Sequence, residues 1–184
     1  MPNNLEDAAK IAIKQCMAVK KNENVLIIVD KANCPIGQSL FDEAIKVGAE
    51  VVMMEMTPRK NDGNEPPFLV AEAMKNADVI LIPTSKSLSH TNARMEASEN
   101  GARIATLPGI TEDMMTRTLC ADYKKIAKTS QKIADVLDKG KMARLTTPAG
   151  TDLTMNIEGR IAEADTGIND FVGAFSNLPA GEAY

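Results

Sequence analysis

Four short apolar segments, each separated from the next by a segment with helical periodicity, most constrain the fold of this 184-residue chain. The apolar segments are rich in β-branched residues and shorter than typical helices, so they predict strands buried on both faces of a sheet. They lie at residues 25–29, 50–56, 79–82 and 103–107. Because strands that alternate with helices form right-handed βαβ crossovers, we expect a parallel sheet covered on both faces.

The helical segments between these strands have their own start and stop signals. The first is predicted over residues 4–21, where Asn3 and Glu6 resemble a capping box. Asn33 can cap the second helix, and Gly48 lies just past its end. Together, strands and helices predict an α/β fold with a Rossmann-like parallel sheet. The remaining helices are predicted near residues 68–76, 90–100 and 122–138.

The pattern changes after Gly140. Residues 142–145 and 153–157 are short alternating segments with Gly and Pro between them, which is typical of antiparallel strands. We therefore expect a Rossmann-like N-terminal domain at residues 1–140 and the short β-rich start of a second, incomplete domain at residues 141–184. No closing helix is apparent in the second part, so we expect it to pack only partially.

Composition argues against several classes of partner. The net charge is -4, aromatic residues make up 3% and Trp is absent, so neither a basic field nor a stacking surface for nucleic acid is expected. The N-terminus lacks the pattern of a signal peptide, and the apolar runs are too short to cross a membrane. The three cysteines show no CxxC spacing and are expected to be reduced thiols. We expect a cytoplasmic protein.

The loop after the first strand, residues 30–37, does not favour a nucleotide cofactor. A dinucleotide site needs a GxGxxG sequence at this place, and only Gly37 is present. A phosphate-binding GxxxxGK[ST] sequence is absent from the whole chain.

Residues 84–94 form a polar loop after the third strand. The loop contains several hydroxyl groups, the single histidine and two cations, and the carboxyl ends of parallel strands are where α/β proteins bind ligands. We expect a ligand-binding or interface loop here, and we favour Ser87 or Ser89 as a helix cap over a catalytic role. The residues singled out are Lys86, Ser89, His90 and Arg94.

Several longer sequence segments resemble the N-terminal domain of M29-like metallopeptidases, the family of thermophilic aminopeptidase T and leucyl aminopeptidase. The last of them is Asn-Leu-Pro-Ala-Gly-Glu, residues 177–182. The others are residues 86–94 followed by 101–111, and residues 148–154 followed by Glu158-Gly-Arg160.

This resemblance implies a dimeric, metal-dependent hydrolase that removes N-terminal amino acids from peptides. It implies that Glu182 is a metal ligand of a two-metal site of the Zn, Co or Mg type, whose other ligands lie further along the full-length parent. By itself the 184-residue chain is then expected to be inactive and to bind no cofactor.

Two alternatives remain open from the sequence. Iron-dependent dihydroxypyridine-type dioxygenases resemble the same scaffold and hold a single iron, so the chain could be a fragment of such an enzyme. The chain could also be a stand-alone α/β module that binds a ligand or forms a dimer.

Overall fold

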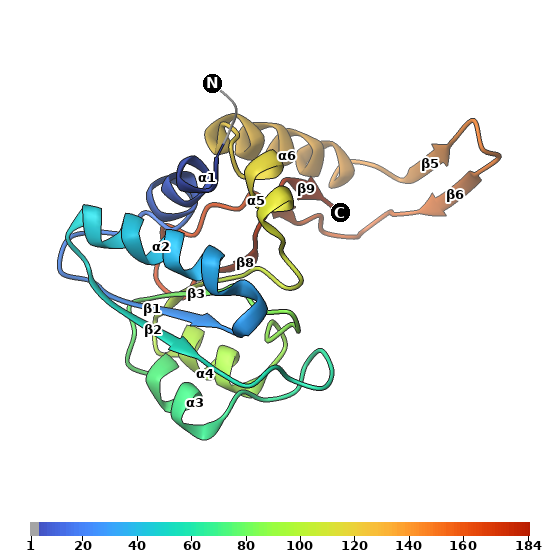
Figure 1. Cartoon of the computed structure of the whole chain (residues 1–184). Coiled ribbons are helices and arrows are strands. Elements are labelled where there is room, and N and C mark those ends of the chain that lie inside the picture. The colour runs from blue at the N-terminus through green and yellow to red at the C-terminus, as the bar shows by residue number, and fades with distance from the viewer. Residues whose placement is uncertain (1–3) are drawn as a thin grey trace. The chain divides into compact units, whose positions relative to one another are not determined.

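Five parallel strands form the sheet of the first of two compact units (Figure 1). The structure is a computed structural model that describes residues 4–184. The strand order is β2-β1-β3-β4-β8, and each neighbouring pair is parallel. The expected α/β fold with a parallel sheet is therefore confirmed. The strands are β1 (Asn24–Val29), β2 (Glu50–Glu55), β3 (Val79–Ile82), β4 (Arg103–Thr106) and β8 (Phe175–Asn177).

Helices cover both faces of this sheet. One face carries α1 with its continuation η1, α2 and α5, whereas the other carries α3 and α4 (Figure 1). None of the helices within residues 4–184 is long and apolar enough to cross a membrane. The bounds are α1 (Leu5–Ile11), η1 (Ala12–Cys16), η2 (Lys31–Asn33), α2 (Cys34–Val47), α3 (Phe68–Met74), α4 (Asn92–Glu99) and α5 (Glu112–Thr118).

The central strands of the sheet form the core. Every residue of β3 and β4 is buried, as expected for strands covered on both faces. Each fully buried aliphatic side chain contributes about 1.5–3 kcal/mol relative to an exposed one. Helix α2 approaches β1 closely at Gly37, where an added Cβ would lie 2.4 Å from Cγ1 of Val29. The close packing of helix on sheet therefore requires glycine at this position.

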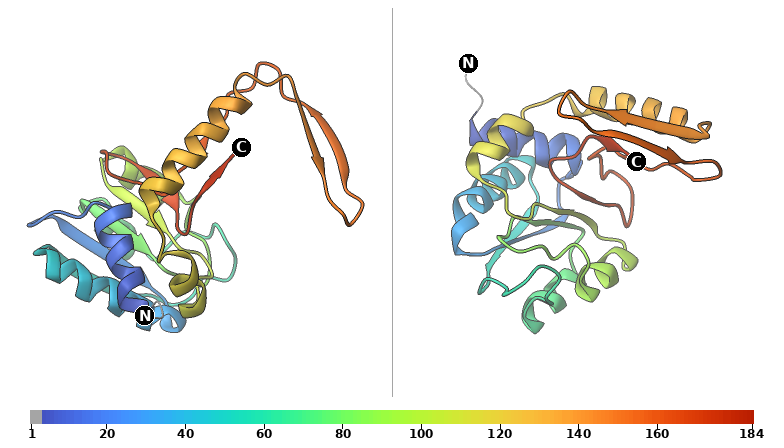
Figure 2. Two further views of the ribbon diagram at one scale, coloured as in Figure 1. Left: turned by 90° about the horizontal axis from the view of Figure 1, so that it is seen from above. Right: turned by 90° about the vertical axis from the view of Figure 1, so that its right-hand side faces the viewer.

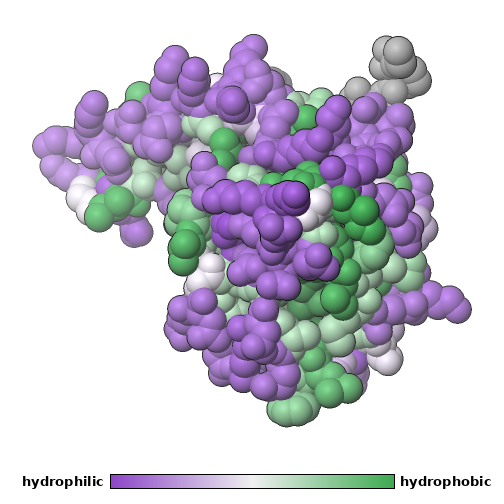
Figure 3. All heavy atoms as spheres, turned by 90° about the vertical axis from the view of Figure 1, so that its left-hand side faces the viewer, coloured by the Kyte–Doolittle hydropathy of each residue, from purple (hydrophilic) through white to green (hydrophobic). Residues whose placement is uncertain are grey.

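Apolar side chains also remain exposed on this unit. Val52 of β2 is 58% exposed, and Phe68 and Leu69 at the start of α3 are 74% and 72% exposed. On the face shown in Figure 3, apolar surface extends from the centre of the view to its lower edge, while the upper part is mostly polar. In the described part of the chain, β2 pairs only with β1, so its outer edge is open.

The second unit comprises Asp122–Thr166 and Ala180–Tyr184. Helix α6 packs against the small antiparallel sheet of β7 and β9. A separate antiparallel hairpin, β5–β6, extends from the same unit (Figure 2). This hairpin confirms the two strands predicted after Gly140. The elements are α6 (Tyr123–Leu137), β5 (Met142–Thr146), β6 (Asp152–Asn156), β7 (Ala164–Asp165) and β9 (Glu182–Ala183).

The division of the chain into residues 1–140 and 141–184 stays a prediction about domains. The compact units group residues differently, because α6 belongs with the later strands and β8 belongs with the parallel sheet.

Three local expectations need correction. The sequence predicted four strands in the sheet, but β8 adds a fifth, which has only three residues and was too short to stand out. The helix predicted over residues 4–21 ends at Cys16, where η1, a π-helical turn, closes it. Asn3 lies outside the described residues, and the helix is capped by Asn4, whose side chain accepts a hydrogen bond from the backbone of Asp7.

Candidate functional site

The carboxyl ends of β1 and β3 form a topological switch point. The chain leaves β1 toward α2 on one face of the sheet and leaves β3 toward α4 on the other face (Figure 1). Loops diverge there, and in open α/β sheets this divergence creates the crevice in which ligands bind. The observed order, with β1 between β2 and β3, is that of the flavodoxin-like sheets.

A buried carboxylate joins the two loops at this point. Asp30, directly after β1, is 1% exposed. Its Oδ2 accepts a hydrogen bond from the backbone of Ser85 at 2.7 Å, and the Ser85 hydroxyl donates to the same oxygen. Its Oδ1 accepts a hydrogen bond from Nδ2 of Asn33 at 3.0 Å. Because these donors satisfy the carboxylate, Asp30 holds the loops after β1 and β3 in place.

A second polar network links the next three strand ends. The hydroxyls of Ser89 and Thr106 lie 2.8 Å apart, and both donate to Oδ1 of Asn177, at 3.1 and 2.5 Å. Ser89 and Thr106 are buried. This network fixes the loop after β3 against the ends of β4 and β8. Ser89 was singled out from the sequence, whereas Thr106 and Asn177 were not, because their pairing depends on the register of a strand that was missed.

The other singled-out residues of the loop have separate surroundings. Arg94 donates a hydrogen bond from Nε to the carbonyl of Ser89 at 2.7 Å, and its guanidinium lies 4.3 Å from the ring centroid of Phe175. Burial lowers the pKa of Arg94. Lys86 faces Asp62 at 3.9 Å, and His90 is exposed. The structure therefore brings Ser89 and Arg94 together, while Lys86 interacts elsewhere.

The expected helix cap in this loop was wrong. Neither Ser87 nor Ser89 caps α4, which begins after Thr91. The Thr91 side chain accepts a hydrogen bond from the backbone of Arg94 at 3.2 Å and donates one to the carbonyl of Leu88 at 2.8 Å. His90 therefore precedes the helix and does not lie in its first turn.

A cleft of about 510 Å³ opens at the switch point, between the loops after β1, β3 and β4. Asn33, Ser85 and Thr111 line it together with the acidic residues Glu112 and Asp113. Among residues 4–184, no lysine or arginine lines it, so the cleft favours neutral or cationic ligands over anions. From the sequence, Glu112 and Asp113 were interpreted only as an acidic helix start.

Glu182 lies in the second unit, on β9. It is exposed and stands opposite Asp165 of β7 in the antiparallel pair. The negative charge of Glu163, together with burial and the charges of Asp165 and Glu182, raises the pKa of the neighbouring Tyr184. Within residues 4–184, no three His, Cys, Asp or Glu residues lie close enough together to hold a metal ion. The role of Glu182 as a metal ligand stays a prediction.

Comparison with known proteins covers almost the whole chain. The family model of 2,5-dihydroxypyridine 5,6-dioxygenase (NicX) matches residues 4–184. The structure of 2,5-dihydroxypyridine dioxygenase from Pseudomonas putida KT2440 is similar with a TM-score of 0.73 and 17% identity, over 96% of this chain and 54% of that one. Wild-type AmpT from Thermus thermophilus is similar with a TM-score of 0.62 and 16% identity, over 96% of this chain and 59% of that one.

The two similar structures are considerably longer than this chain, which spans little more than half of their length. At this level of identity they support the fold and do not by themselves assign an activity. No curated protein sequence is significantly similar to the chain.

Proposed function

Because the chain belongs to the 2,5-dihydroxypyridine 5,6-dioxygenase family, we propose that it is part of an enzyme that opens the ring of a dihydroxylated pyridine with dioxygen. The observation that carries this proposal is the match of the family model over residues 4–184. The similarity to the Pseudomonas putida dioxygenase supports it, since the two share a fold over 96% of this chain.

The aminopeptidase interpretation of the sequence was wrong. The family model and the structure with the higher TM-score both point to an oxidoreductase, so the chain is not assigned to metallopeptidases, to hydrolases or to enzymes with peptide substrates. The sequence segments that suggested a peptidase, such as residues 86–94 and 101–111, form loops, the start of α4 and strand β4 of the α/β unit. A scaffold of this kind supports different chemistries, so its resemblance could not decide between them.

We expect a divalent metal as the cofactor of this reaction. For a dihydroxypyridine-type dioxygenase, the expected metal is iron. The described residues do not fit a complete metal centre, because they contain no group of three suitable ligands. Glu182 can supply at most one carboxylate from an exposed position on β9. We therefore expect that ligands from outside residues 4–184 complete the site, and that the part described here shapes and supports it.

Several properties expected from the sequence belong to this proposal. We expect a homodimer in the cytoplasm, without nucleic acid or membrane as partner. A ligand-binding role for the first unit is favoured by the cleft of about 510 Å³ at the switch point, which Glu112 and Asp113 line.

The test is an assay of the polypeptide that contains these residues, supplied with Fe(II) without oxygen and then given 2,5-dihydroxypyridine and dioxygen. We expect oxygen uptake together with loss of the absorbance of the ring. A parallel assay uses leucine p-nitroanilide, which we expect to remain intact. Hydrolysis of the anilide without oxygen uptake would refute the proposal.

The same assay on the 184-residue chain alone should show no oxygen uptake. Because the described residues provide no group of three ligands, calorimetric titration of this chain with Fe(II) should show no tight binding. Tight binding that is lost in Glu182→Gln would mean that the chain assembles a metal centre by itself.

A further inference from the structure

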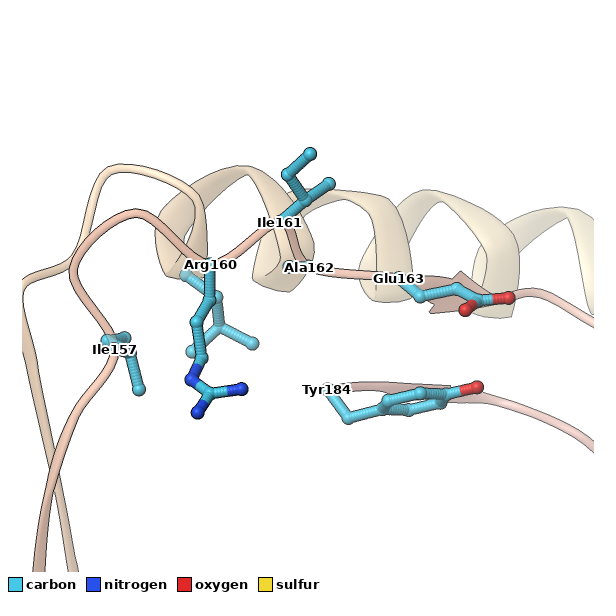
Figure 4. Close-up of a pocket in the computed structure, with 7 residues that line it drawn as sticks. Ile157, Arg160, Ile161, Ala162, Glu163 and Tyr184 are labelled. Carbon is cyan, nitrogen blue, oxygen red and sulfur yellow. The ribbon is translucent and has the colours of Figure 1, made fainter.

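The second unit contains a pocket of about 380 Å³. It lies between the end of α6, the segment that follows β6, and Tyr184 (Figure 4). Leu137 and Ile157 provide apolar surface, whereas Arg160, Glu163 and Tyr184 provide polar groups. All of these residues belong to the same compact unit.

A short turn brings Arg160 to this pocket. The backbone N–H of Arg160 donates to the carbonyl of Ile157 at 3.1 Å, and Gly159 has a φ of +77°, which a glycine adopts without strain. The carboxylate of Glu158 pairs with Lys141 at 2.6 Å, at the base of the β5–β6 hairpin. The carboxylate of Glu158 therefore forms its ion pair with Lys141 and does not neutralise the nearby Arg160.

The guanidinium of Arg160 has no side-chain hydrogen bond or ion pair with any residue between 4 and 184. In Figure 4 it lies at the pocket, with Ile157 on one side and Tyr184 on the other. Each of the other arginines in the same range has a polar partner. These are Arg59, Arg94, Arg103, Arg117 and Arg144.

The remaining lining residues define what can approach this cation. Two backbone hydrogen bonds with Glu163, of 3.0 and 2.8 Å, hold the backbone of Tyr184 in place. The Tyr184 ring therefore offers a flat surface beside the apolar side chains of Leu137 and Ile157. The Glu163 carboxylate lies beside that ring in Figure 4 and repels a second negative charge.

We propose that this pocket binds a small aromatic monocarboxylate, with the carboxylate on Arg160 and the ring against Tyr184, Ile157 and Leu137. A guanidinium presents parallel N–H donors that match a carboxylate, which makes this pairing both strong and directional. A phosphate dianion is disfavoured because Arg160 is the one cation that lines the pocket among the described residues, and Glu163 lines it too. The proposal depends on the pocket alone and not on the ring-cleaving activity.

The test uses 4-fluorobenzoate as the probe and fluorine NMR as the readout. We expect a saturable shift or broadening of its signal with the wild-type protein. Arg160→Gln should weaken binding about tenfold or more, since a charge-assisted hydrogen bond is lost. Arg160→Lys should give an intermediate result, because it keeps the charge but not the fork of donors. Tyr184→Ala should also weaken binding.

The matched control is Arg144→Gln, which removes another exposed arginine of the same unit, one that pairs with Asp152. Arg144→Gln should bind 4-fluorobenzoate as the wild type does. The cation 4-fluorobenzylamine should not bind at Arg160 in the wild type or in Arg144→Gln. The proposal is overturned if 4-fluorobenzoate does not bind, or if Arg160→Gln, with an unchanged urea midpoint, binds it equally well. Cleavage of dihydroxypyridine is measured in a separate assay. A failure to bind 4-fluorobenzoate therefore leaves the proposed dioxygenase function intact, and a failure of the dioxygenase assay leaves the binding proposal intact.

Discussion

Arg103 begins the buried strand β4, yet it carries a charge into the interior of the first unit. Its side chain is only 8% exposed, and the guanidinium pairs with both carboxylate oxygens of Glu23, at 3.1 and 2.8 Å. Its Nε also donates to the carbonyl of Met17 at 3.2 Å. A two-point pair of this kind fixes the end of η1 against the sheet, and removing one partner leaves the other charge poorly solvated.

We therefore expect Arg103→Met to lower the free energy of unfolding by about 3 kcal/mol, the lower end of the range for a broken buried pair, because Glu23 retains 17% exposure. Urea denaturation at pH 7 measures this change. Arg117→Gln is the control, since its pair with Asp113 is exposed and should contribute little. Equal effects of the two substitutions would contradict the role given to Arg103.

The pair of Glu23 and Arg103 also predicts that the stability of the fold depends on pH. Burial alone would raise the pKa of Glu23, but hydrogen bonds from Arg103 and from the Lys20 backbone, with their charges, hold it below its ordinary value of 4.5. A lowered pKa in the folded state stabilises the protein above pH 4.5, and this contribution is lost as the pH falls through the folded value. The difference in urea midpoint between wild type and Glu23→Gln should therefore be largest near pH 6 and shrink toward pH 3. A difference that grows on acidification would refute this.

Among the secondary-structure elements, α4 shows how a single cap sets the start of a helix. Thr91 is 1% exposed and makes two hydrogen bonds, one with the backbone of Arg94 and one with that of Leu88. Thr91→Ala should lower the free energy of unfolding by about 1 kcal/mol or somewhat more. Ser87→Ala should cost less, since Ser87 caps no helix. Thermal denaturation compares the two, and a larger loss for Ser87→Ala would favour the cap expected from the sequence.

The elements that sequence reasoning could find are those with long or repetitive signals. The apolar runs at residues 25–29 and 79–82 are strands, as expected for short, continuous apolar segments between helices in a parallel sheet. Strand β8 was missed because three residues, Phe-Ser-Asn, show no periodicity. Because β8 was not predicted, the network of Ser89, Thr106 and Asn177 was not predicted either. The register of β8 against β4 determines that the Thr106 hydroxyl lies beside the Asn177 amide.

At the scale of the whole molecule, the family could not be read from the motifs. Those sequence segments belong to a scaffold that supports more than one chemistry. The described residues also contain no group of three metal ligands from which a reaction could be argued. The cleft at the switch point could be placed only in part, since Ser85 follows a predicted strand whereas Glu112 and Asp113 looked like an ordinary helix start.

Packing differs strongly between parts of the molecule, so local stability should differ as well. All residues of β3 and β4 are buried, whereas β5 and β6 are almost entirely exposed and, within residues 4–184, pair only with each other. A lone two-stranded hairpin is marginal in water. In hydrogen exchange followed by mass spectrometry, amides of the hairpin should exchange far faster than those of β3 and β4, and β8 should be intermediate. Equal protection of the hairpin and β3 would contradict this.

The place of β8 in the sheet also has a consequence for synthesis on the ribosome. Strand β4 receives its outer partner from residues far along the chain, since Thr106 and its hydrogen-bonded neighbour Asn177 are 71 positions apart. Until that later segment emerges, the nascent chain presents one edge of β4 without its strand partner, the kind of edge on which chains aggregate and chaperones bind. A shortened polypeptide that stops after residue 140 would keep this edge permanently.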